Sequence, residues 1–353
     1  MKYKINLRIR NMKHPNVTIK FLADIAGVSF STVAKALHND PAINIDTRRR
    51  IQKIAAEYNY RPNILAKGLR NRRTKTIGVI LNDLQSPFYS EIYKAIGDVL
   101  EQKGYTMFLA DSKYEEELEK KNISTMIGQG VEGLIVSSVS EASENIALLL
   151  RESVKTVFID NRPSRDDICC VYVDHEAAAS LAIRHLVASG HRNILLLNGP
   201  ENLPSSQHFA RGYRETLKAC HIPYRDELVK FNAIDIATTT HLMDNIINGN
   251  DAVKPDDFTA IVTLSDVTAI GVYDAAMTHG FTIPGTYSVV GYDNIFSTKY
   301  LNPPLTTIHQ PKEQTGVLAA TLLLESIENQ ACNMTQIILN PELKSRASVR
   351  IIS

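Results

Sequence analysis

Basic side chains are concentrated in the first 75 residues of this sequence, which hold 17 Lys and Arg but only four Asp and Glu, a local net charge of +13. The remaining 278 residues carry a net charge of −12, so the value of +1 for the whole chain is a cancellation. Clustered cations of this kind suit the binding of a polyanion, and nucleic acid is the leading candidate. The alternative is a disordered basic tail, and the spacing of the apolar residues decides against it.

Side chains spaced for catalysis or metal binding are not found. The sequence lacks the G-x-x-x-x-G-K-[ST], G-x-S-x-G and H-E-x-x-H motifs, and His175-Glu176 is not followed by a second His at the required spacing. The ten histidines are scattered and form no set of metal ligands. We therefore predict no catalytic residues, no metal and no cofactor.

The remaining composition is that of an ordinary soluble protein. The four cysteines, Cys169, Cys170, Cys220 and Cys332, show no C-x-x-C spacing, so we expect reduced thiols. No run of 18 apolar residues could cross a membrane, and the N-terminal MKYKINLRIRN lacks the apolar segment of a signal peptide. We expect a cytoplasmic protein with no membrane partner.

The elements that position the basic residues are short helices. From Thr18, a natural N-cap, apolar residues recur at i, i+3, i+4 and i+7 over residues 19–26, and Gly27 then ends the helix. Ser29 can cap a second helix, which turns Val33, Ala36 and Leu37 to one side and Phe30, Ser31, Ala34 and Lys35 to the other. This is the helix-turn-helix pattern, whose second helix enters the major groove of DNA.

A third helix is predicted from Ile45 to Tyr58, with Asn44 as its cap and with Ile51, Ile54 and Ala55 turned inward. The run Arg48, Arg49, Arg50 lies near its start. A charge run is more often a solvated face than a binding site. Within a three-helix unit that already carries +13, contact with phosphates is the favoured interpretation.

Residues 17–80 resemble the N-terminus of the lactose/galactose repressor (LacI/GalR) family. The elements A-G-V-S-x-x-T-V, T-R-x-x-I, Y-R-P-N and A-x-x-L, followed by T-I-G-V, occur in order at the family spacing. The resemblance implies that Phe30, Ser31 and Lys35 face base edges. Many relatives have Arg where Lys35 stands, and Lys lacks the planar bidentate fork, so the half-site sequence is not inherited from them. The candidate DNA-binding residues are Thr18, Lys20, Ser29, Phe30, Ser31, Thr32, Lys35, Arg48, Tyr60, Asn63, Ala66 and Leu69.

The segment from Asn63 to Leu69 resembles the hinge helix of that family, two copies of which lie in the minor groove. The resemblance implies that Leu69 wedges between base pairs and kinks the duplex. Considered without the family, a helix of this length that contains Gly68 is too short to persist alone in water, so it should fold against its dimer mate and DNA. A plain linker with a chance leucine is the alternative.

From Thr76 onward, strand-like apolar runs alternate with helix-like ones, which is typical of doubly wound parallel sheets. The strand-like runs are TIGVIL, YTMFLA, GLIVSS, TVFID, NILLLN, LVKF, AIVTL and YSVVGYD. Eight strands exceed one compact sheet, so we expect two lobes with a cleft between them. The stretch resembles the sensor domain of the same family, itself like periplasmic sugar-binding proteins, whose chain crosses between lobes near residues 172, 305 and 339 here.

The predicted fold is therefore a small all-α helix-turn-helix domain plus a two-lobed α/β sensor domain that is periplasmic-binding-protein-like, with doubly wound parallel sheets. The predicted parts are a basic arm (1–15), a helix-turn-helix domain (16–61), a hinge helix with linker (62–75) and an effector-binding and dimerisation domain (76–353). Within the last, lobe 1 takes about 76–172 and 306–338, and lobe 2 about 173–305 and 339–353.

Ligands of open α/β sheets bind beyond the carboxyl ends of the strands, where this sequence places polar and aromatic residues. The resemblance assigns them to the effector, with Asp266 the firmest through its setting TLSDVTAIGVYDAA. A carboxylate that accepts two hydroxyl groups beside an aromatic face is a natural site for a sugar ring. The alternatives are a helix N-cap for Asp266 and core packing for Phe88 or Tyr89. The candidate effector-binding residues are Ser86, Phe88, Tyr89, Ser137, Asp160, Asn161, Phe209, Asp266, Asp293 and Gln310.

One position departs from the family. Many relatives place Arg three residues before the glycine of an R-x-x-G-F/Y element, where this sequence has Phe209 in HFARGY. Arg211 lies one residue before Gly212, and because a helix rotates about 100° per residue it does not replace the missing group. Stacking on Phe209 is the substitute that we consider.

The favoured function is a sequence-specific transcriptional regulator, a repressor, that binds a near-palindromic double-stranded DNA operator as a homodimer under control of a small-molecule effector, a sugar or sugar derivative. The chain stops at ELKSRASVRIIS without an appended heptad helix, which favours a dimer over a tetramer. The alternatives are a soluble sugar-binding protein without a DNA role, which has no use for residues 18–70, and an enzyme on a doubly wound fold.

Overall fold

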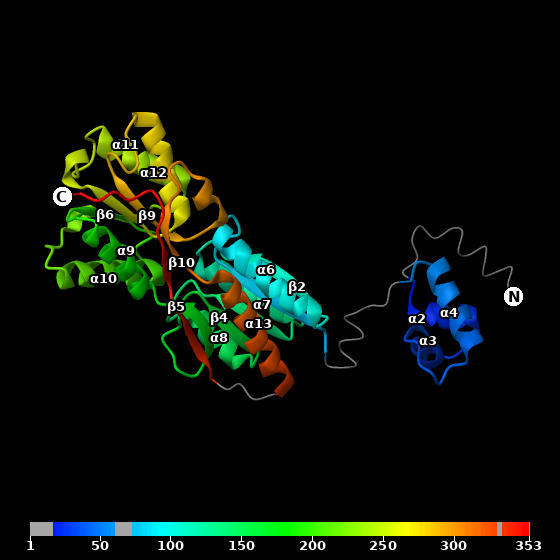
Figure 1. The fold of residues 1–353 in the computed structure, drawn as a ribbon. Helices are drawn as coiled ribbons and strands as arrows, with labels where there is room; N and C mark the ends of the chain where they lie inside the picture. Colours follow the sequence, from blue (N-terminus) through cyan, green and yellow to red (C-terminus); the bar gives the residue numbers. More distant parts are fainter. Residues whose placement is uncertain (1–16, 61–72, 330–333, 353) are drawn as a thin grey trace. The chain divides into compact units, whose positions relative to one another are not determined.

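The computed structural model describes residues 17–60, 73–329 and 334–352, and the chain divides into two units, residues 1–74 and 75–353. The described part of the smaller unit contains α2 (Ile19–Ala26), α3 (Phe30–Leu37) and α4 (Ile45–Glu57), as Figure 1 shows. The predicted caps are confirmed, because the side chains of Thr18, Ser29 and Asn44 each accept a hydrogen bond from a backbone N–H of the first turn. Gly27 ends α2 in the left-handed conformation, at φ 65°.

The three helices share one small apolar core. Leu22, Val33 and Ala36 are fully buried, and Ile51 of α4 is 1% exposed. Ile54 is only partly buried and packs at the edge of this cluster. Because each helix buries one face in this way, residues 17–60 of the basic segment form a folded module and not a tail.

The larger unit contains two six-stranded sheets. The first has the order β11-β5-β4-β3-β1-β2 and the second the order β12-β10-β9-β8-β6-β7. The strands of the first are β1 (Thr76–Leu81), β2 (Thr106–Asp111), β3 (Gly133–Ser137), β4 (Lys155–Ile159), β5 (Cys169–Val173) and β11 (Gln336–Leu339). Those of the second are β6 (Ile194–Leu197), β7 (Val229–Lys230), β8 (Ala260–Thr263), β9 (Ser288–Asp293), β10 (Thr306–His309) and β12 (Glu342–Lys344). All pairings are parallel except that of β10 with β12.

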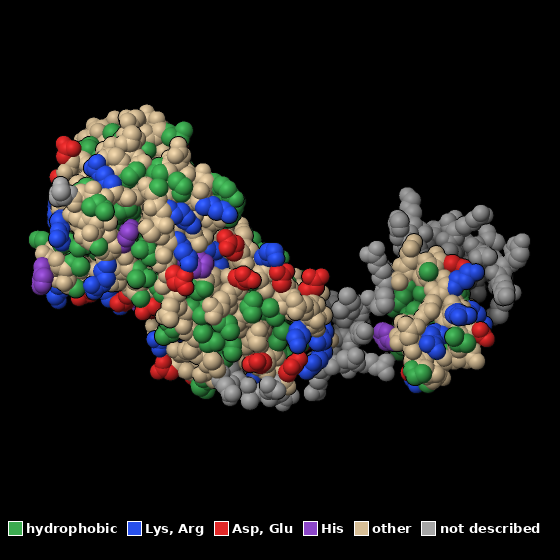
Figure 2. Space-filling model, in the orientation of Figure 1, with side chains coloured by type: hydrophobic (Ala, Val, Ile, Leu, Met, Phe, Trp, Pro, Cys, Tyr) green, Lys and Arg blue, Asp and Glu red, His purple; other side chains and the backbone are tan. Residues whose placement is uncertain are grey.

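Helices cover both faces of each sheet, as the doubly wound pattern predicts (Figure 1). They are α6 (Pro87–Gln102), α7 (Glu116–Gly128), α8 (Glu144–Arg151), α9 (His175–Ala188), α10 (Pro204–Ala219), α11 (Ile236–Ile247), α12 (Asp266–His279) and α13 (Lys312–Asn329). Short 3-10 turns occur at η1 (Asp226–Leu228), η2 (Pro255–Asp257) and η3 (Phe296–Tyr300). On the larger unit, acidic and basic side chains are interspersed over the face that Figure 2 shows.

Three close helix contacts depend on glycine. A Cβ on Gly316 of α13 would lie 2.6 Å from the carbonyl oxygen of Ile92 on α6, and a Cβ on Gly212 of α10 would lie 2.5 Å from that of Glu176 on α9. A Cβ on Gly271 of α12 would likewise lie 2.8 Å from the carbonyl oxygen of Ile236 on α11, so each lobe has at least one tightly packed helix pair.

The chain crosses between the lobes after β5, after β10 and after β11, and one predicted boundary is wrong. Residues 306–309 were predicted to begin the return to lobe 1, but β10 pairs with β9 in the sheet of lobe 2, so the second crossing follows His309. The third crossing joins β11 in lobe 1 to β12 in lobe 2. β5, β10, β11 and β12 were not among the strand-like runs, and all four lie next to these crossings.

Candidate functional site

The outer face of α3 is exposed while its inner face is buried. Ser31 and Lys35 are exposed, and half of the Phe30 surface is open to solvent, which is unusual for a large apolar side chain. Thr18 and Lys20, at the start of α2, are exposed as well, and Thr32 is half-buried. The predicted base-facing residues thus share one accessible helix face, and Figure 2 shows Lys and Arg side chains on the same unit.

Two of the three arginines at the start of α4 form hydrogen bonds within the helical module itself. Arg48 donates hydrogen bonds to the carbonyl oxygens of Asn39 and Ile43, each at 3.3 Å, and so holds the loop before α4. Arg50 donates to the carbonyl oxygen of Ala26 at 3.0 Å, at the C-terminus of α2, where a cation is favourable. Of the three, Arg49 has no such bond among the described contacts and is exposed.

Other predicted DNA contacts lie at or beyond the limit of the described residues. Tyr60 is half-buried, with its N–H bonded to the carbonyl oxygen of Ala55 at 2.8 Å, and partial burial raises the pKa of its hydroxyl. Asn63, Ala66 and Leu69, with the whole predicted hinge helix, lie outside the described residues.

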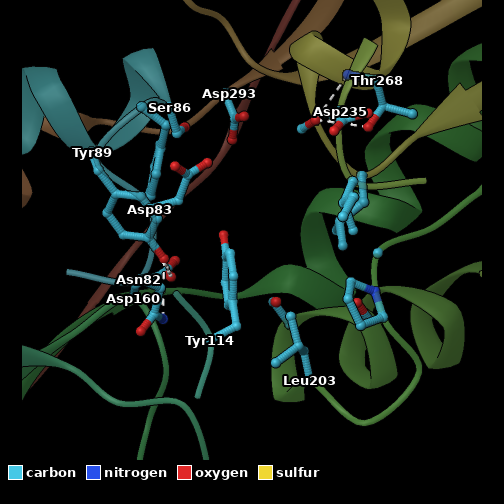
Figure 3. Close-up of a pocket in the computed structure, with 18 of the residues that line it drawn as sticks. Asn82, Asp83, Ser86, Tyr89, Tyr114, Asp160, Leu203, Asp235, Thr268 and Asp293 are labelled. Atoms are coloured by element: carbon cyan, nitrogen blue, oxygen red, sulfur yellow. Dashed lines mark hydrogen bonds between the residues drawn. The ribbon is translucent and has the colours of Figure 1, made fainter. Parts of the chain in front are cut away.

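A cavity of about 570 Å³ lies between the carboxyl ends of the two sheets, and we call it the interlobe cleft (Figure 3). Of the predicted effector residues, Ser86, Phe88, Tyr89, Asp160, Asp293 and Gln310 line it. Further lining residues that are not among the candidate effector-binding residues include Asn82, Asp83, Tyr114, His175, Leu203, Asp235, Ser265 and Thr268. Both lobes present polar groups to this space.

The lobe 1 wall is a hydrogen-bonded polar network. The Tyr89 hydroxyl donates to Asp160 Oδ2 at 2.8 Å, and the Asn82 amide donates to Ser137 Oγ at 3.0 Å. Burial, and then the charge of Asp160, raises the pKa of Tyr89 well above its usual value, so the phenol remains a donor. Ser137 is fully buried behind Tyr89 and does not line the cleft, so its predicted ligand contact becomes a supporting contact. Phe88 and Tyr89 also belong to the core of lobe 1.

The lobe 2 wall is built from helix starts and the end of β9. Asp235 caps α11 by accepting from the backbone N–H of Thr238 at 2.7 Å, and Ser265 caps α12. Asp293, at φ 110°, accepts from the Gln310 amide at 2.8 Å, and burial raises the pKa of this carboxyl well above its usual range. The left-handed backbone at Asp293 is a strained position of the kind that functional sites retain.

Asp266, the residue in which the sequence placed most weight, does not line the interlobe cleft. It is fully buried, accepts from the Thr307 hydroxyl at 2.6 Å and from the backbone N–H of Ile295 at 2.8 Å, and burial raises its pKa to about 7. Ser265, and not Asp266, is the N-cap of α12. In this structure Asp266 ties α12 to β10 beneath the cleft, and its contact with the effector stays a prediction.

Phe209 likewise lies outside the lining of the cleft. Its side chain is fully buried in the core of lobe 2, with its ring 5.4 Å from that of Tyr292, so it does not stack on a ligand in the cleft. Arg211 lies at the surface and donates to Glu176 Oε1 at 2.9 Å. Neither residue supplies the cleft with a cation.

Asn161 does not line the interlobe cleft either. It is buried, its amide donates to the carbonyl oxygen of Ser138 at 2.8 Å, and it lines a second cavity of about 520 Å³. His208 of lobe 2 lies at this second cavity, with Nε2 2.9 Å from Glu141 Oε1 of lobe 1 and Nδ1 3.0 Å from Glu176 Oε1. Asp160 and His175 line both spaces.

Two features bear on catalysis and cofactors. Residues 128–133, GQGVEG, match the G-x-G-x-x-G motif of dinucleotide-binding sites. They run from the end of α7 to the start of β3, whereas a dinucleotide site needs the motif between a strand and the following helix. Among the described residues, no group of three or more His, Cys, Asp or Glu side chains is placed to hold a metal ion. In the same part of the chain, no helix combines the length and apolarity that crossing a membrane requires.

Comparison with known proteins matches both units. Residues 18–63 match the family of bacterial regulatory proteins, lacI family, and residues 74–347 match that of periplasmic binding proteins and sugar binding domain of LacI family. The HTH-type transcriptional repressor PurR of Photorhabdus laumondii is 32% identical over 337 residues, which cover 94% of this chain and 96% of the relative. Catabolite control protein A of Priestia megaterium is 28% identical over 336 residues, covering 95% and 100%.

Solved structures agree. The lac repressor dimer bound to operator and the anti-inducer ONPF superposes with a TM-score of 0.79 at 26% identity, over 95% of this chain and 99% of that one. A LacI family transcriptional regulator from Enterococcus faecium with bound ribose superposes with a TM-score of 0.69 at 26% identity, over 79% and 100%.

Proposed function

This chain belongs to the lacI family of bacterial regulatory proteins, and we propose that it represses transcription by binding a near-palindromic operator as a homodimer. It is a DNA-binding transcriptional regulator with a small-molecule effector, as its relatives in the family are. The operator lies in the cytoplasm, so this function would place the protein there.

The observation that carries the proposal is the exposed face of α3. Val33 and Ala36 bury one side of the helix, which fixes Phe30, Ser31 and Lys35 on the other. Such a helix fits the major groove, where Lys35 can donate to guanine and Phe30 can contact a thymine methyl group. We propose the same DNA role for the remaining candidates, including the hinge residues Asn63, Ala66 and Leu69.

We propose that the effector binds in the interlobe cleft and is a sugar or sugar derivative. Carboxylates and aromatic rings from both lobes surround the cavity, and this is the usual composition of a sugar site. The cleft lies in the domain whose family includes sugar binding domains, and a structural relative holds ribose. We further infer that the cleft binds its ligand without catalysing a reaction, since the relatives are regulators.

Operator binding tests this function directly. Full-length protein should bind DNA from upstream of its own gene in a fluorescence anisotropy titration, and Lys35→Ala should lose about 1 to 3 kcal/mol per lost base contact and relax sequence preference at one symmetric pair of positions. Lys53→Ala, on the exposed side of α4, is the matched control, since it removes the same charge from the same module. Unchanged affinity and preference in Lys35→Ala would refute the placement of α3.

A further inference from the structure

The interlobe cleft is acidic. Five aspartates line it, Asp83, Asp111, Asp160, Asp235 and Asp293, against Lys113 as the single Lys or Arg among the described lining residues. In the part of the chain that the structure describes, none of the five lies within 4.0 Å of a Lys or Arg side-chain nitrogen, and the sole ion-pair contact is that of Asp160 with His175, at 3.9 Å. Among the described residues, these carboxylates therefore have no ion pair with Lys or Arg, and Asp293, whose pKa is raised by burial, adds less negative charge than the other four.

Hydrogen bonds from neighbouring residues occupy only part of the acceptor capacity of these carboxylates. Asp83 Oδ1 accepts from the backbone N–H of Gln85 at 2.8 Å, and Asp111 Oδ1 accepts from that of Lys113 at 2.9 Å. A carboxylate offers about four lone-pair sites and, when ionised, no donor. A ligand that fills this space must therefore bring donors, which hydroxyl, amine and amide groups supply.

His175 adds a buried nitrogen without a partner. Its side chain is 6% exposed, Nδ1 lies 2.8 Å from the Tyr292 hydroxyl, and Nε2 has no hydrogen bond among the described residues. Burial lowers the pKa of His175, so the ring is neutral at pH 7. Nε2 lies 3.9 Å from Asp160 Oδ1, so together the two atoms could hold one hydroxyl group, which would donate to the carboxylate and accept from the imidazole N–H.

Tyr114 supplies an aromatic face. It follows the end of β2, where Lys113 and Tyr114 both have a left-handed backbone, at φ 52° and 58°. Figure 3 shows its ring standing in the cleft between the Asp160 side and Leu203. Tyr114 is 38% exposed, and an aromatic ring that lines the cavity can stack on the apolar side of a sugar or on a base.

We propose that the effector is a ring rich in hydroxyl or amino groups that carries neither phosphate nor carboxylate, a free sugar, amino sugar or nucleoside. This inference rests on the proposed function, and it narrows the ligand class of the same cleft. A phosphate group carries about 1.5 to 2 negative charges at pH 7. Facing four aspartates besides Asp293, whose raised pKa favours its neutral form, and with Lys113 as the single Lys or Arg in the described lining, the phosphorylated form of a ligand should bind at least roughly 100-fold more weakly than the free form.

The test is calorimetry on the full chain with matched compounds. The probes are ribose with ribose 5-phosphate, glucose with glucosamine and glucose 6-phosphate, and adenosine and cytidine with their monophosphates. The expected result is that every compound that binds is unphosphorylated and that its phosphate binds at least about 100-fold more weakly. A phosphorylated probe that binds as tightly as its parent, or more tightly, would overturn the proposal.

A charge variant sharpens the comparison. In D83N/D235N, Asn can keep both turn and cap hydrogen bonds, and the ratio between parent and phosphate should narrow at least about tenfold. D98N/D256N removes two carboxylates from the exposed surface and should leave the ratio unchanged. A ratio that stays the same in D83N/D235N would also overturn the proposal. Failure of the wild-type protein to bind operator DNA in an anisotropy titration would instead count against the proposed function. Failure of the ligand proposal and failure of the proposed function are therefore distinguishable.

Discussion

Replacing His208 by Gln should weaken the attachment of the two lobes to each other on the side of the second cavity. His208 on α10 of lobe 2 contacts Glu141 of lobe 1 at 2.9 Å and Glu176 on α9 at 3.0 Å. Both ring nitrogens face carboxylate oxygens, so both must donate, and the bridge requires the charged imidazolium. Consistent with this, the pKa of His208 is raised, chiefly by the hydrogen bond to Glu141.

The magnitude follows from the geometry and the exposure. Two charge-assisted hydrogen bonds of good length would be worth several kcal/mol if dry. All three side chains are roughly a third exposed, at 31%, 27% and 39%, so screening reduces the bridge between the lobes to about 1 kcal/mol, or roughly fivefold in the equilibrium between closed and open lobes.

The pH dependence has a definite sign. The folded pKa of His208 is raised above the ordinary 6.5, so its contribution is fully present below about 6.5 and is lost as the pH rises through the raised value. The pKa of Glu141 is lowered, chiefly by the hydrogen bond to His208, so its contribution is present above its ordinary 4.5 and is lost as the pH falls through the lowered value. The bridge is therefore strongest in mildly acid solution.

The assay is thermal unfolding and effector titration at pH 6 and pH 8.5. His208→Gln should lower stability and effector affinity at pH 6 and have little effect at pH 8.5. His279→Gln is the control, because His279 contacts Asp244 at 2.7 Å within lobe 2 alone. The interpretation fails if His208→Gln retains the pH dependence of the parent, or if the control changes effector affinity equally.

Three further outcomes are expected. Operator affinity should fall about 10³ to 10⁵-fold between 50 and 200 mM salt if six to ten phosphates are contacted, and a flat response in anisotropy would contradict the basic-module assignment. Leu69→Ala should reduce operator bending in a permuted-fragment gel assay without changing the melting temperature of the larger unit, and equal bending would argue against intercalation. Asp266→Ala should lose about 2 to 4 kcal/mol, because it leaves the N–H of Ile295 unpaired. Asp266→Asn can still accept from that N–H and bond to Thr307. The folded pKa of Asp266, about 7, makes the stability of the wild type fall as the pH rises from about 4 to 7. Urea titrations should show that this fall in stability is absent from Asp266→Asn.

The sequence predicted the small module well because its signals are local. Caps at Thr18, Ser29 and Asn44, and a stop at Gly27, each act within one helical turn, so helix starts could be assigned without tertiary information. The missed strands lack such signals. β10 reads TTIH, and its two threonines look polar in sequence, yet both are fully buried, because the backbone N–H of Arg346 and the carboxylate of Asp266 provide hydrogen-bond partners for their hydroxyl groups from distant segments.

The sequence indicated which residues lie near the cleft better than it indicated which way their side chains face. The rule of strand carboxyl ends brought Tyr89, Asp160 and Asp293 to the cleft, and applied more fully it would have found Asn82, Asp83 and Tyr114 after β1 and β2. It cannot state which way a side chain faces. Ser265 lines the cleft, whereas its neighbour Asp266, about 100° further round the helix, points to Thr307 beneath it.

The cleft is built on the segments that cross between the lobes, and this arrangement gives a physical route from ligand to DNA affinity. His175 begins α9 after the first crossing, and Gln310 and Lys312 follow the second. Lys312 is 2% exposed, donates to the carbonyl oxygen of Asp293 at 2.6 Å and lies 3.5 Å from Glu91 Oε2 of lobe 1. A ligand that bonds to Asp293 or His175 therefore acts on the groups that set the angle between the lobes. An effector changes operator affinity only through unequal binding to two conformations. A ligand site that includes residues next to the interlobe crossings favours such unequal binding.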